Sequence, residues 1–319
     1  MSSSERIDGF VHMKQIVVTA IFLLVTAGTT LQSVGPARAN VNGLQDTAAL
    51  RRVSYQGVTF AFDPSLASEV RPETISASTE GKPSDIWPEH LGFSLVGYPR
   101  PRSLPENDPH IRVFSVPKFR EAFAIATKEY VKSLAQPSTT ADWAADFDSE
   151  IKDLKSLLAS KPGKANLPRF LTKLRHDPGC GPTMPFLPMW EACQAFFARP
   201  RYITFRNGEG VLFLTQMNVS ETSQVTNQGL EYAFQGITND GASYVYAEFS
   251  VAAPFLPKGD EPAVQAWNQK NYLLSHKSPQ YQKYVRPIVA KLEALPSDQF
   301  KPNLTLLEAL ISSMEAQTK

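Results

Sequence analysis

The sequence predicts an α+β fold, in which an antiparallel meander sheet packs against amphipathic helices in a single compact domain after a signal peptide. Strand-like and helix-like segments come in successive blocks, whereas a parallel α/β sheet requires them to alternate. Two glycine-containing turns join β-rich segments in the second half of the chain, as in β-hairpins. Hydrophobic residues make up 42% of the 319 residues, which suffices for a packed core and excludes a disordered chain.

Residues 1–39 have the features of a signal peptide. Lys14 precedes an uncharged apolar run, which leads to the small residues that signal peptidase requires around Ala39. We therefore expect cleavage between Ala39 and Asn40. The alternative is a retained membrane anchor, but the apolar run of 16 residues is shorter than the ~20 that span a bilayer. The protein is thus predicted to be exported, to the periplasm or the extracellular space.

The exported product is expected to carry no net charge. Residues 1–39 hold three of the 32 basic and two of the 31 acidic residues, which leaves 29 of each. This balance gives no electrostatic attraction for nucleic acid. The chain has no phosphate-binding glycine loop, no His-Glu-x-x-His and no Cys-x-x-Cys motif, so we expect neither a cofactor nor a metal. The expected partner is an envelope or extracellular protein or a small ligand, with membrane contact only through an uncleaved signal peptide.

Short strands are predicted at the start of the mature chain. Residues 40–52 show no periodicity and are expected to be a flexible lead-in. The Pro- and Ser-rich residues 64–90 and 99–109 are expected to be surface loops. Strands are predicted where β-branched and aromatic residues gather, at 53–55, 58–62, 92–98 and 111–116.

Two amphipathic helices are predicted next. From Pro117, apolar residues recur every three or four positions, which is typical of one helical face. Thr139 and Thr140 are possible caps for a second helix, whose apolar face runs from Trp143 to Leu158. Together the two segments predict a helical hairpin.

The strongest β signal lies in the second half. Residues 201–206 and 211–217 flank a predicted turn at 207–210, and 230–238 and 242–252 flank another at 239–241. These four segments predict a four-stranded antiparallel meander.

Two helices are predicted at the C-terminal end. Ser278 precedes a proline, as an N-cap residue before Pro at the first helical position. Asn303 and a capping box from Thr305 to Glu308 begin the last helix. We expect residues 53–319 to form one domain, although two packed halves, 53–176 and 177–319, would fit the same pattern.

Cys180 and Cys193 are the only cysteines, and both follow the signal peptide. In an oxidising compartment a disulfide bond is the simplest interpretation. A metal site or a reactive thiol is the alternative, but only His176 stands nearby. His90, His110, His176 and His276 are each isolated in sequence, which favours structural roles.

The loop between the cysteines is rich in large apolar residues and prolines. It is expected to plug the core or, if exposed, to form an interaction loop for a partner or a membrane interface. Its candidate contact residues are Met184, Phe186, Leu187, Met189 and Trp190.

One face of the meander gathers tyrosines beside amide and charged side chains. Such residues combine apolar area with directional hydrogen bonds and suit a sugar or a peptide. The alternative is that helices cover this face or that it is an ordinary solvated surface. The candidate binding residues are Tyr202, Arg206, Gln216, Gln235, Tyr244, Tyr246 and Glu248. The opposite face is expected to carry Ile203, Phe205, Phe213, Tyr232, Phe234, Val245, Phe249 and Val251.

A carboxylate-based hydrolase is the runner-up function. Glu231 and Glu248 lie on two strands of the meander, and glycosidases need only two suitably separated carboxylates. A solvated sheet face would explain the same residues without catalysis, so no catalytic residue is assigned.

Three segments resemble parts of uncharacterised exported bacterial proteins, many of which are lipid-anchored. The segments are VLFLTQM at 211–217, YAFQGITNDGASYVYAEFSVAAPFLP at 232–257 and LTLLEALISSM at 304–314. The resemblance implies a compartment and no catalytic residues, and this chain lacks the lipid-bearing cysteine. The sequence therefore predicts an exported, non-catalytic binding or interaction protein, with an extracytoplasmic hydrolase acting on a polymer as the alternative.

Overall fold

The computed structural model describes residues 49–81, 85–99, 109–133, 142–174, 183–187, 192–219 and 222–317. The chain divides into two compact units, residues 1–46 and 47–319, and every described residue belongs to the second. The predicted signal peptide, with Ala39 and Asn40 at its cleavage site, lies outside the described residues.

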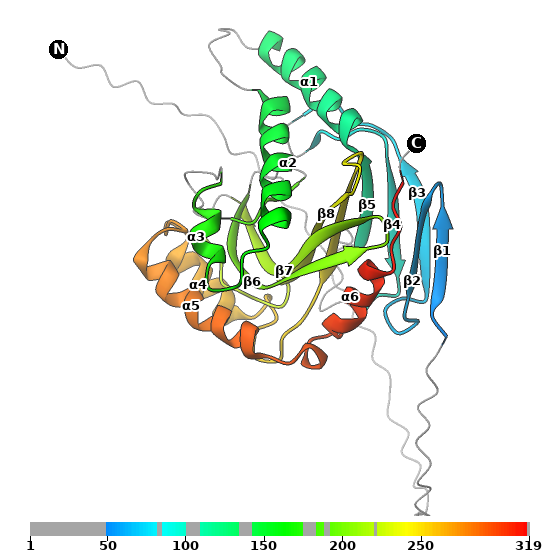
Figure 1. Ribbon diagram of the computed structural model, residues 1–319. Helices are drawn as coiled ribbons and strands as arrows, with labels where there is room; N and C mark the ends of the chain where they lie inside the picture. Colours follow the sequence, from blue (N-terminus) through cyan, green and yellow to red (C-terminus); the bar gives the residue numbers. More distant parts are fainter. Residues whose placement is uncertain are drawn as a thin grey trace, which may run out of the picture. The chain divides into compact units, whose positions relative to one another are not determined.

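A seven-stranded antiparallel sheet forms the centre of the unit 47–319 (Figure 1). The α+β prediction is confirmed. Strand β6 pairs with β7, β7 with β8 and β8 with β9, which gives the predicted meander. Strand β5 pairs with β9, so that the N-terminal strands extend the same sheet. In spatial order the strands are β3 (Glu69–Ile75), β4 (His90–Val96), β5 (His110–Ser115), β9 (Ser243–Ser250), β8 (Glu231–Thr238), β7 (Gly208–Val219) and β6 (Ala192–Phe205).

Strand β3 corrects the prediction of a continuous surface loop over 64–90. Its sequence, EVRPETI, is polar and most of its residues are exposed, so that it lacks the apolar alternation that marks a strand. It lies at the sheet edge, which is where a strand can hold Pro72 without losing a ladder hydrogen bond.

The first hairpin turn of the meander is shorter than predicted. Gly208 already pairs with Phe205, whereas the sequence predicted a turn over 207–210. Two aromatic rings lie over the glycines at the start of β7. A Cβ atom at Gly208 would lie 2.2 Å from the Phe205 ring, and one at Gly210 would lie 2.4 Å from the Phe234 ring. These glycines therefore serve close packing within a strand.

Six α-helices are described, and local capping explains where several of them begin. Asp142 accepts a hydrogen bond from the Ala145 amide at the start of α2, whereas the predicted caps Thr139 and Thr140 lie outside the described residues. Ser278 caps α5 as predicted. The helices are α1 (Val116–Ser133), α2 (Trp143–Ser160), α3 (Leu167–Leu171), α4 (Pro262–Asn271), α5 (Pro279–Ala294) and α6 (Leu304–Ser312).

Helix α6 begins with a simpler cap than the predicted capping box. The Asn303 side chain accepts from the Thr305 amide, as predicted. Glu308 instead accepts a hydrogen bond from the Tyr232 hydroxyl at 3.0 Å and forms an ion pair with Arg201. The carboxylate that the sequence assigned to the cap thus joins the helix to the sheet.

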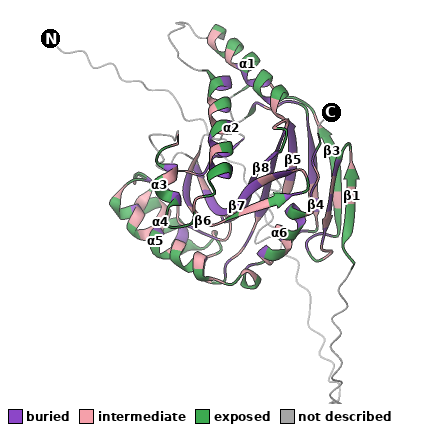
Figure 2. Cartoon of the chain, viewed as in Figure 1, coloured by how far each residue is buried: buried purple, intermediate pink, exposed green. Residues whose placement is uncertain are grey.

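The two faces of the sheet are covered by different elements (Figure 1). Helices α1 and α2 cover one face, which we call the helix-covered face, and α5, α6 and the hairpin of β1 (Arg51–Tyr55) and β2 (Val58–Phe62) cover the other. Figure 2 shows that the central strands are buried and that the helices are exposed on their outer sides. Within the described ranges, no helix has both the length and the apolarity of a membrane span.

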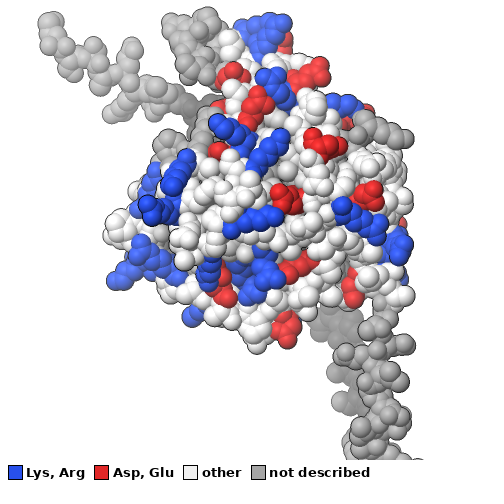
Figure 3. Space-filling model, viewed as in Figure 1, with Lys and Arg blue, Asp and Glu red and all other residues white. Residues whose placement is uncertain are grey.

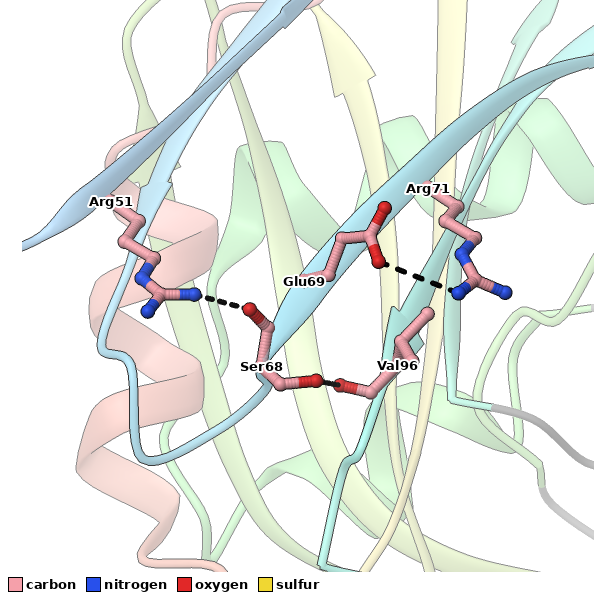
Figure 4. Close-up of polar contacts among 5 residues, drawn as sticks. All are labelled: Arg51, Ser68, Glu69, Arg71 and Val96. Atoms are coloured by element: carbon pink, nitrogen blue, oxygen red, sulfur yellow. Dashed lines mark hydrogen bonds and ion pairs between the residues drawn. The ribbon is translucent and has the colours of Figure 1, made fainter.

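Polar contacts join the β1–β2 hairpin to the edge of the large sheet (Figure 4). The Arg51 guanidinium donates to the Ser68 carbonyl, and the Ser68 hydroxyl donates to the Val96 carbonyl at 3.1 Å. Arg71 and Glu69, both on β3, form an exposed ion pair at 3.4 Å. The hairpin is therefore held at one end through the connection that leads into β3.

Candidate functional site

The predicted tyrosine face is not open to a ligand, which corrects the expectation of an accessible binding surface. Tyr244 and Tyr246 are fully buried, Gln235 is almost fully buried, and Glu248 is 8% exposed. All four side chains lie on the helix-covered face, beneath α1, α2 and residues 183–187. Phe213 lies on the same face and not on the opposite one, because it pairs with Ala233.

Residues 183–187 themselves occupy this face. Gln194 forms two hydrogen bonds with the backbone of Met184, at 3.1 and 2.9 Å. Gln235 accepts from the Leu187 amide at 3.0 Å, and the Tyr244 hydroxyl donates to the Leu187 carbonyl at 2.7 Å. The polar side chains that suggested a ligand site therefore bind a segment of the chain.

The predicted interaction loop is corrected for the residues that the structure describes. Met184 and Leu187 are 1% and 2% exposed, and Phe186 is half-buried against the Phe213 ring. They plug the core, which was the other interpretation of this loop. Met189 and Trp190 lie outside the described residues, as does Cys180.

Replacing Tyr244 by phenylalanine is expected to lower the free energy of unfolding by about 1–2 kcal/mol, because the buried Leu187 carbonyl loses its partner. Tyr202→Phe is the matched control, since its hydroxyl bonds the Pro162 carbonyl at a half-buried position and at a longer distance, 3.2 Å. Urea unfolding measures both variants. If Tyr244→Phe loses no more unfolding free energy than Tyr202→Phe, the Tyr244 hydroxyl does not hold residues 183–187 on this face.

The other predicted binding residues lie apart from one another. Tyr202 is at the edge strand β6, and burial raises its pKa to about 12. Arg206 is exposed in the hairpin turn, where its side chain forms an ion pair with Glu315 at 3.8 Å. Gln216 points to the opposite face from Tyr244 and Tyr246, since neighbouring residues of a strand alternate in direction. The seven residues therefore do not form one site.

A polar cleft lies beside Gln216, between the end of β7, residues 222–229 and α4. It consists of two adjoining hollows of about 430 and 370 Å³, which share Met217, Ser223 and Asn268. We call it the amide cleft, because amide and hydroxyl side chains dominate its walls. Its polar lining consists of Gln216, Asn218, Thr222, Ser223, Gln224, Thr226, Gln228, Glu231, Asn268, Gln269 and Tyr272.

A buried hydrogen-bond network fixes the floor of the amide cleft around Asn218. The Asn218 carbonyl oxygen accepts from Gln216 at 3.0 Å and from the Ser223 hydroxyl at 2.6 Å. Its amine lies 3.1 Å from both the His276 ring nitrogen and the Tyr281 hydroxyl. Asn218 is only 3% exposed, so that this network joins β7, α5 and the loop after β7.

Helix α4 supplies the side of the amide cleft that can meet a ligand. Asn268 accepts from the Gln224 amide at 2.7 Å through its side-chain oxygen, and no described acceptor takes its amine. Gln269 and Tyr272 are exposed on the same wall. A donor, a second amide and an aromatic ring are thus available to a hydroxyl-rich ligand.

Glu231 and Glu248, the predicted carboxylate pair, come together on the helix-covered face, and Glu231 also borders the amide cleft. Glu248 lies opposite Ala233 in the ladder, so that it is diagonal to Glu231 on the same face. The two carboxyl groups are hydrogen-bonded to each other, and Tyr246 donates to Glu248. Glycosidases separate their carboxyls by ~5 Å or more, so this arrangement is closer to a pair that shares a proton.

The environment of Glu231 favours its protonated form. Burial is the main cause that raises the pKa of Glu231 well above 4.5, and the charge of Glu248 and their hydrogen bond raise it further. The residue as a whole is half-buried and lines the cleft, whereas its carboxyl group is removed from water. Glu231 is the one carboxyl group among the described lining residues, and its surroundings favour the uncharged form.

Replacing Glu231 by glutamine is expected to stabilise the protein at alkaline pH. Because its pKa is raised, Glu231 stabilises the folded state below pH 4.5, and this stabilisation is lost as the pH rises through the folded-state pKa. Glutamine does not titrate, so the variant should unfold at higher urea than the wild type above neutral pH and at the same urea in acid. If the difference in urea midpoint between the variant and the wild type does not change with pH, the pKa of Glu231 is not raised.

The three described histidines pack against aromatic rings or bond to a buried side chain, as expected for structural roles. His90 stacks on Phe114, His276 is bound to Asn218, and the His110 ring packs edge-on against Tyr246. Within the described ranges no three His, Cys, Asp or Glu side chains gather as a metal site would require. His176 lies outside those ranges.

Comparisons with family models, with curated proteins and with solved structures gave no match for this chain. Sequence reasoning missed the amide cleft because its walls come from separate stretches, around 216–231 and 259–272, that carry no shared motif.

Proposed function

We propose that this chain is an exported, non-catalytic binding protein of the bacterial envelope or exterior, and that it binds a neutral, hydroxyl-rich ligand such as a saccharide. The observation that carries the proposal is the lining of the amide cleft. Its described lining residues comprise six amide and three aliphatic hydroxyl side chains and the aromatic ring of Tyr272, and none of them is Lys or Arg. Amides and hydroxyls match sugar hydroxyls, whereas an anionic ligand would need a basic wall.

Export and a disulfide bond are part of the proposal. The leader sequence supports cleavage between Ala39 and Asn40, and the resemblance to exported bacterial proteins agrees with it. A Cys180–Cys193 bridge suits an oxidising compartment. The absence of a free cysteine among the described residues supports the bridge, since Cys193 is one of them.

The proposal is tested by isothermal titration calorimetry of the exported protein with neutral oligosaccharides: maltotriose, cellotriose and chitotriose. Asn268→Ala is expected to weaken binding of the best ligand about tenfold, because one hydrogen bond to the ligand is lost. Gln265→Ala is the matched control, because Gln265 is exposed on α4 and does not line the cleft.

Equal weakening by the two substitutions would show that the cleft is not the site. Failure of all three oligosaccharides to bind the wild type would contradict the saccharide class itself.

The hydrolase remains a second candidate, favoured by one observation. Glu231 borders the amide cleft, and its buried carboxyl group, hydrogen-bonded to Glu248, has a raised pKa, as the general acid of a hydrolase requires. If the protein is a hydrolase, Glu231→Gln should abolish release of reducing ends from a bound oligosaccharide and leave its affinity within about twofold. A wild type that binds without releasing any product would exclude this candidate.

A further inference from the structure

One surface of the chain is basic although the whole chain is nearly neutral, at +1. Residues 262–292, which span α4, the turn after it and most of α5, contain no Asp or Glu. In Figure 3, Lys and Arg gather over the region where Figure 1 places α3, α4 and α5. The basic residues of this stretch, all of them exposed, are Lys270, Lys277, Lys283, Arg286 and Lys291.

Nearby carboxylates do not neutralise this surface. Glu293 is the first acidic residue after the stretch, and it pairs with Lys164 at 3.0 Å. Among the described residues, no carboxylate pairs with Lys270, Lys283 or Arg286. The positive charges of these three residues are therefore available to an external partner.

An apolar tip lies within the same surface. Leu273 is 81% exposed and its neighbour Tyr272 is 46% exposed, in the turn between α4 and α5. Lys270 and Lys277 flank them in sequence. Among the described large apolar residues that are exposed, these are the only two that are adjacent. A leucine that is 81% exposed buries little apolar area on folding, so its contribution to the core is small.

We propose that the surface formed by α4, the Tyr272–Leu273 turn and α5 binds to an anionic phospholipid bilayer. Basic side chains attract acidic headgroups over about a Debye length, ~8 Å at physiological salt. An apolar tip then gains free energy by entering the boundary between headgroups and acyl chains. A soluble anionic partner would be attracted by the charges but would leave Leu273 in water, and for this reason a bilayer fits better.

This inference goes beyond the proposed function and beyond membrane contact through an uncleaved leader. Tyr272 belongs both to the apolar tip and to the wall of the amide cleft. Binding to a bilayer would thus hold the cleft next to the headgroup surface.

Vesicle co-sedimentation of the exported protein tests the proposal. The probes are vesicles of phosphatidylcholine mixed with phosphatidylglycerol, and vesicles of phosphatidylcholine alone. Any contribution of a retained leader is common to the wild type and all variants, so it cancels when they are compared on the same vesicles. We expect binding to the mixed vesicles that weakens as salt is raised.

The triple variant K270Q/K283Q/R286Q is expected to bind the mixed vesicles about 100-fold more weakly, because each basic residue near an anionic surface contributes about fivefold. The matched control K118Q/K128Q/K152Q removes the same charge from exposed positions on α1 and α2 and should bind like the wild type. Leu273→Ser should weaken binding about tenfold.

Three outcomes would overturn the proposal. The first is equal binding of the wild type to both vesicle types. The second is an equal loss in the control triple variant, which would mean that net charge alone matters. The third is an undiminished affinity of Leu273→Ser together with equally tight binding to soluble polyphosphate, which would identify the partner as a soluble polyanion.

Discussion

Replacing Asn218 by alanine should lower the free energy of unfolding by about 3 kcal/mol, because four buried or half-buried groups each lose a hydrogen-bond partner at once. Its side chain accepts from Gln216 and Ser223, and its amine lies 3.1 Å from the His276 ring and from the Tyr281 hydroxyl. Water cannot replace these bonds easily, since Asn218 is 3% exposed.

The same substitution should also weaken ligand binding, because the network fixes the floor of the amide cleft. Gln269→Ala is the control for stability, since Gln269 is an exposed residue of the cleft wall and its loss should change unfolding by under about 0.5 kcal/mol. Urea unfolding measures both. A loss below about 1 kcal/mol for Asn218→Ala would mean that the network does not hold the cleft.

Acidification from neutral pH to pH 4 should destabilise the protein by about 3 kcal/mol through His90. Burial is the main cause that lowers the pKa of His90 from 6.5 to about 4, and the charges of Arg112 and His110 lower it further, whereas a bond to the Pro88 carbonyl opposes the shift. The unfolded chain therefore takes up the proton first. The stability that neutral His90 gives the folded state is present above pH 6.5 and is lost as the pH falls towards 4.

Burial also lowers the pKa of His276, so that both histidines destabilise the folded protein in acid. The variant His90→Leu separates the two effects, because it removes only the titration of His90. The readout is the change in unfolding free energy between the two pH values, which should be about 3 kcal/mol smaller in the variant than in the wild type. An unchanged acid sensitivity would show that His90 is not buried in its neutral form. Glu231 acts in the opposite direction, since its raised pKa favours the folded state in acid.

Local signals predicted the fold well. The caps at Ser278 and Asn303, the two hairpins and the α+β class all depend on neighbouring residues, and the structure confirms them. Strand β3 could not be predicted in this way. An edge strand makes ladder bonds on one side only and needs no apolar alternation, so its sequence has the composition of a loop.

The site was predicted less well, because it depends on which surface each element covers. The alternation of Tyr244 and Tyr246 correctly placed both on one face of β9, but nothing in their spacing shows that α1, α2 and residues 183–187 bury that face. The sequence named Glu231 and Glu248 together but could not set their separation, which follows from the β8–β9 register. The amide cleft needed the three-dimensional structure, since its two walls are distant in sequence.

Native mass spectrometry of the exported protein tests the central claim most directly, which is that the amide cleft binds a neutral, hydroxyl-rich ligand. The wild type is titrated with the oligosaccharide panel and compared with the double variant N268A/Q269A and with the control Gln265→Ala. The account predicts a discrete one-to-one adduct on the wild type and the control, and its loss from the double variant. An adduct of equal abundance on all three proteins, or no adduct on the wild type, would contradict it.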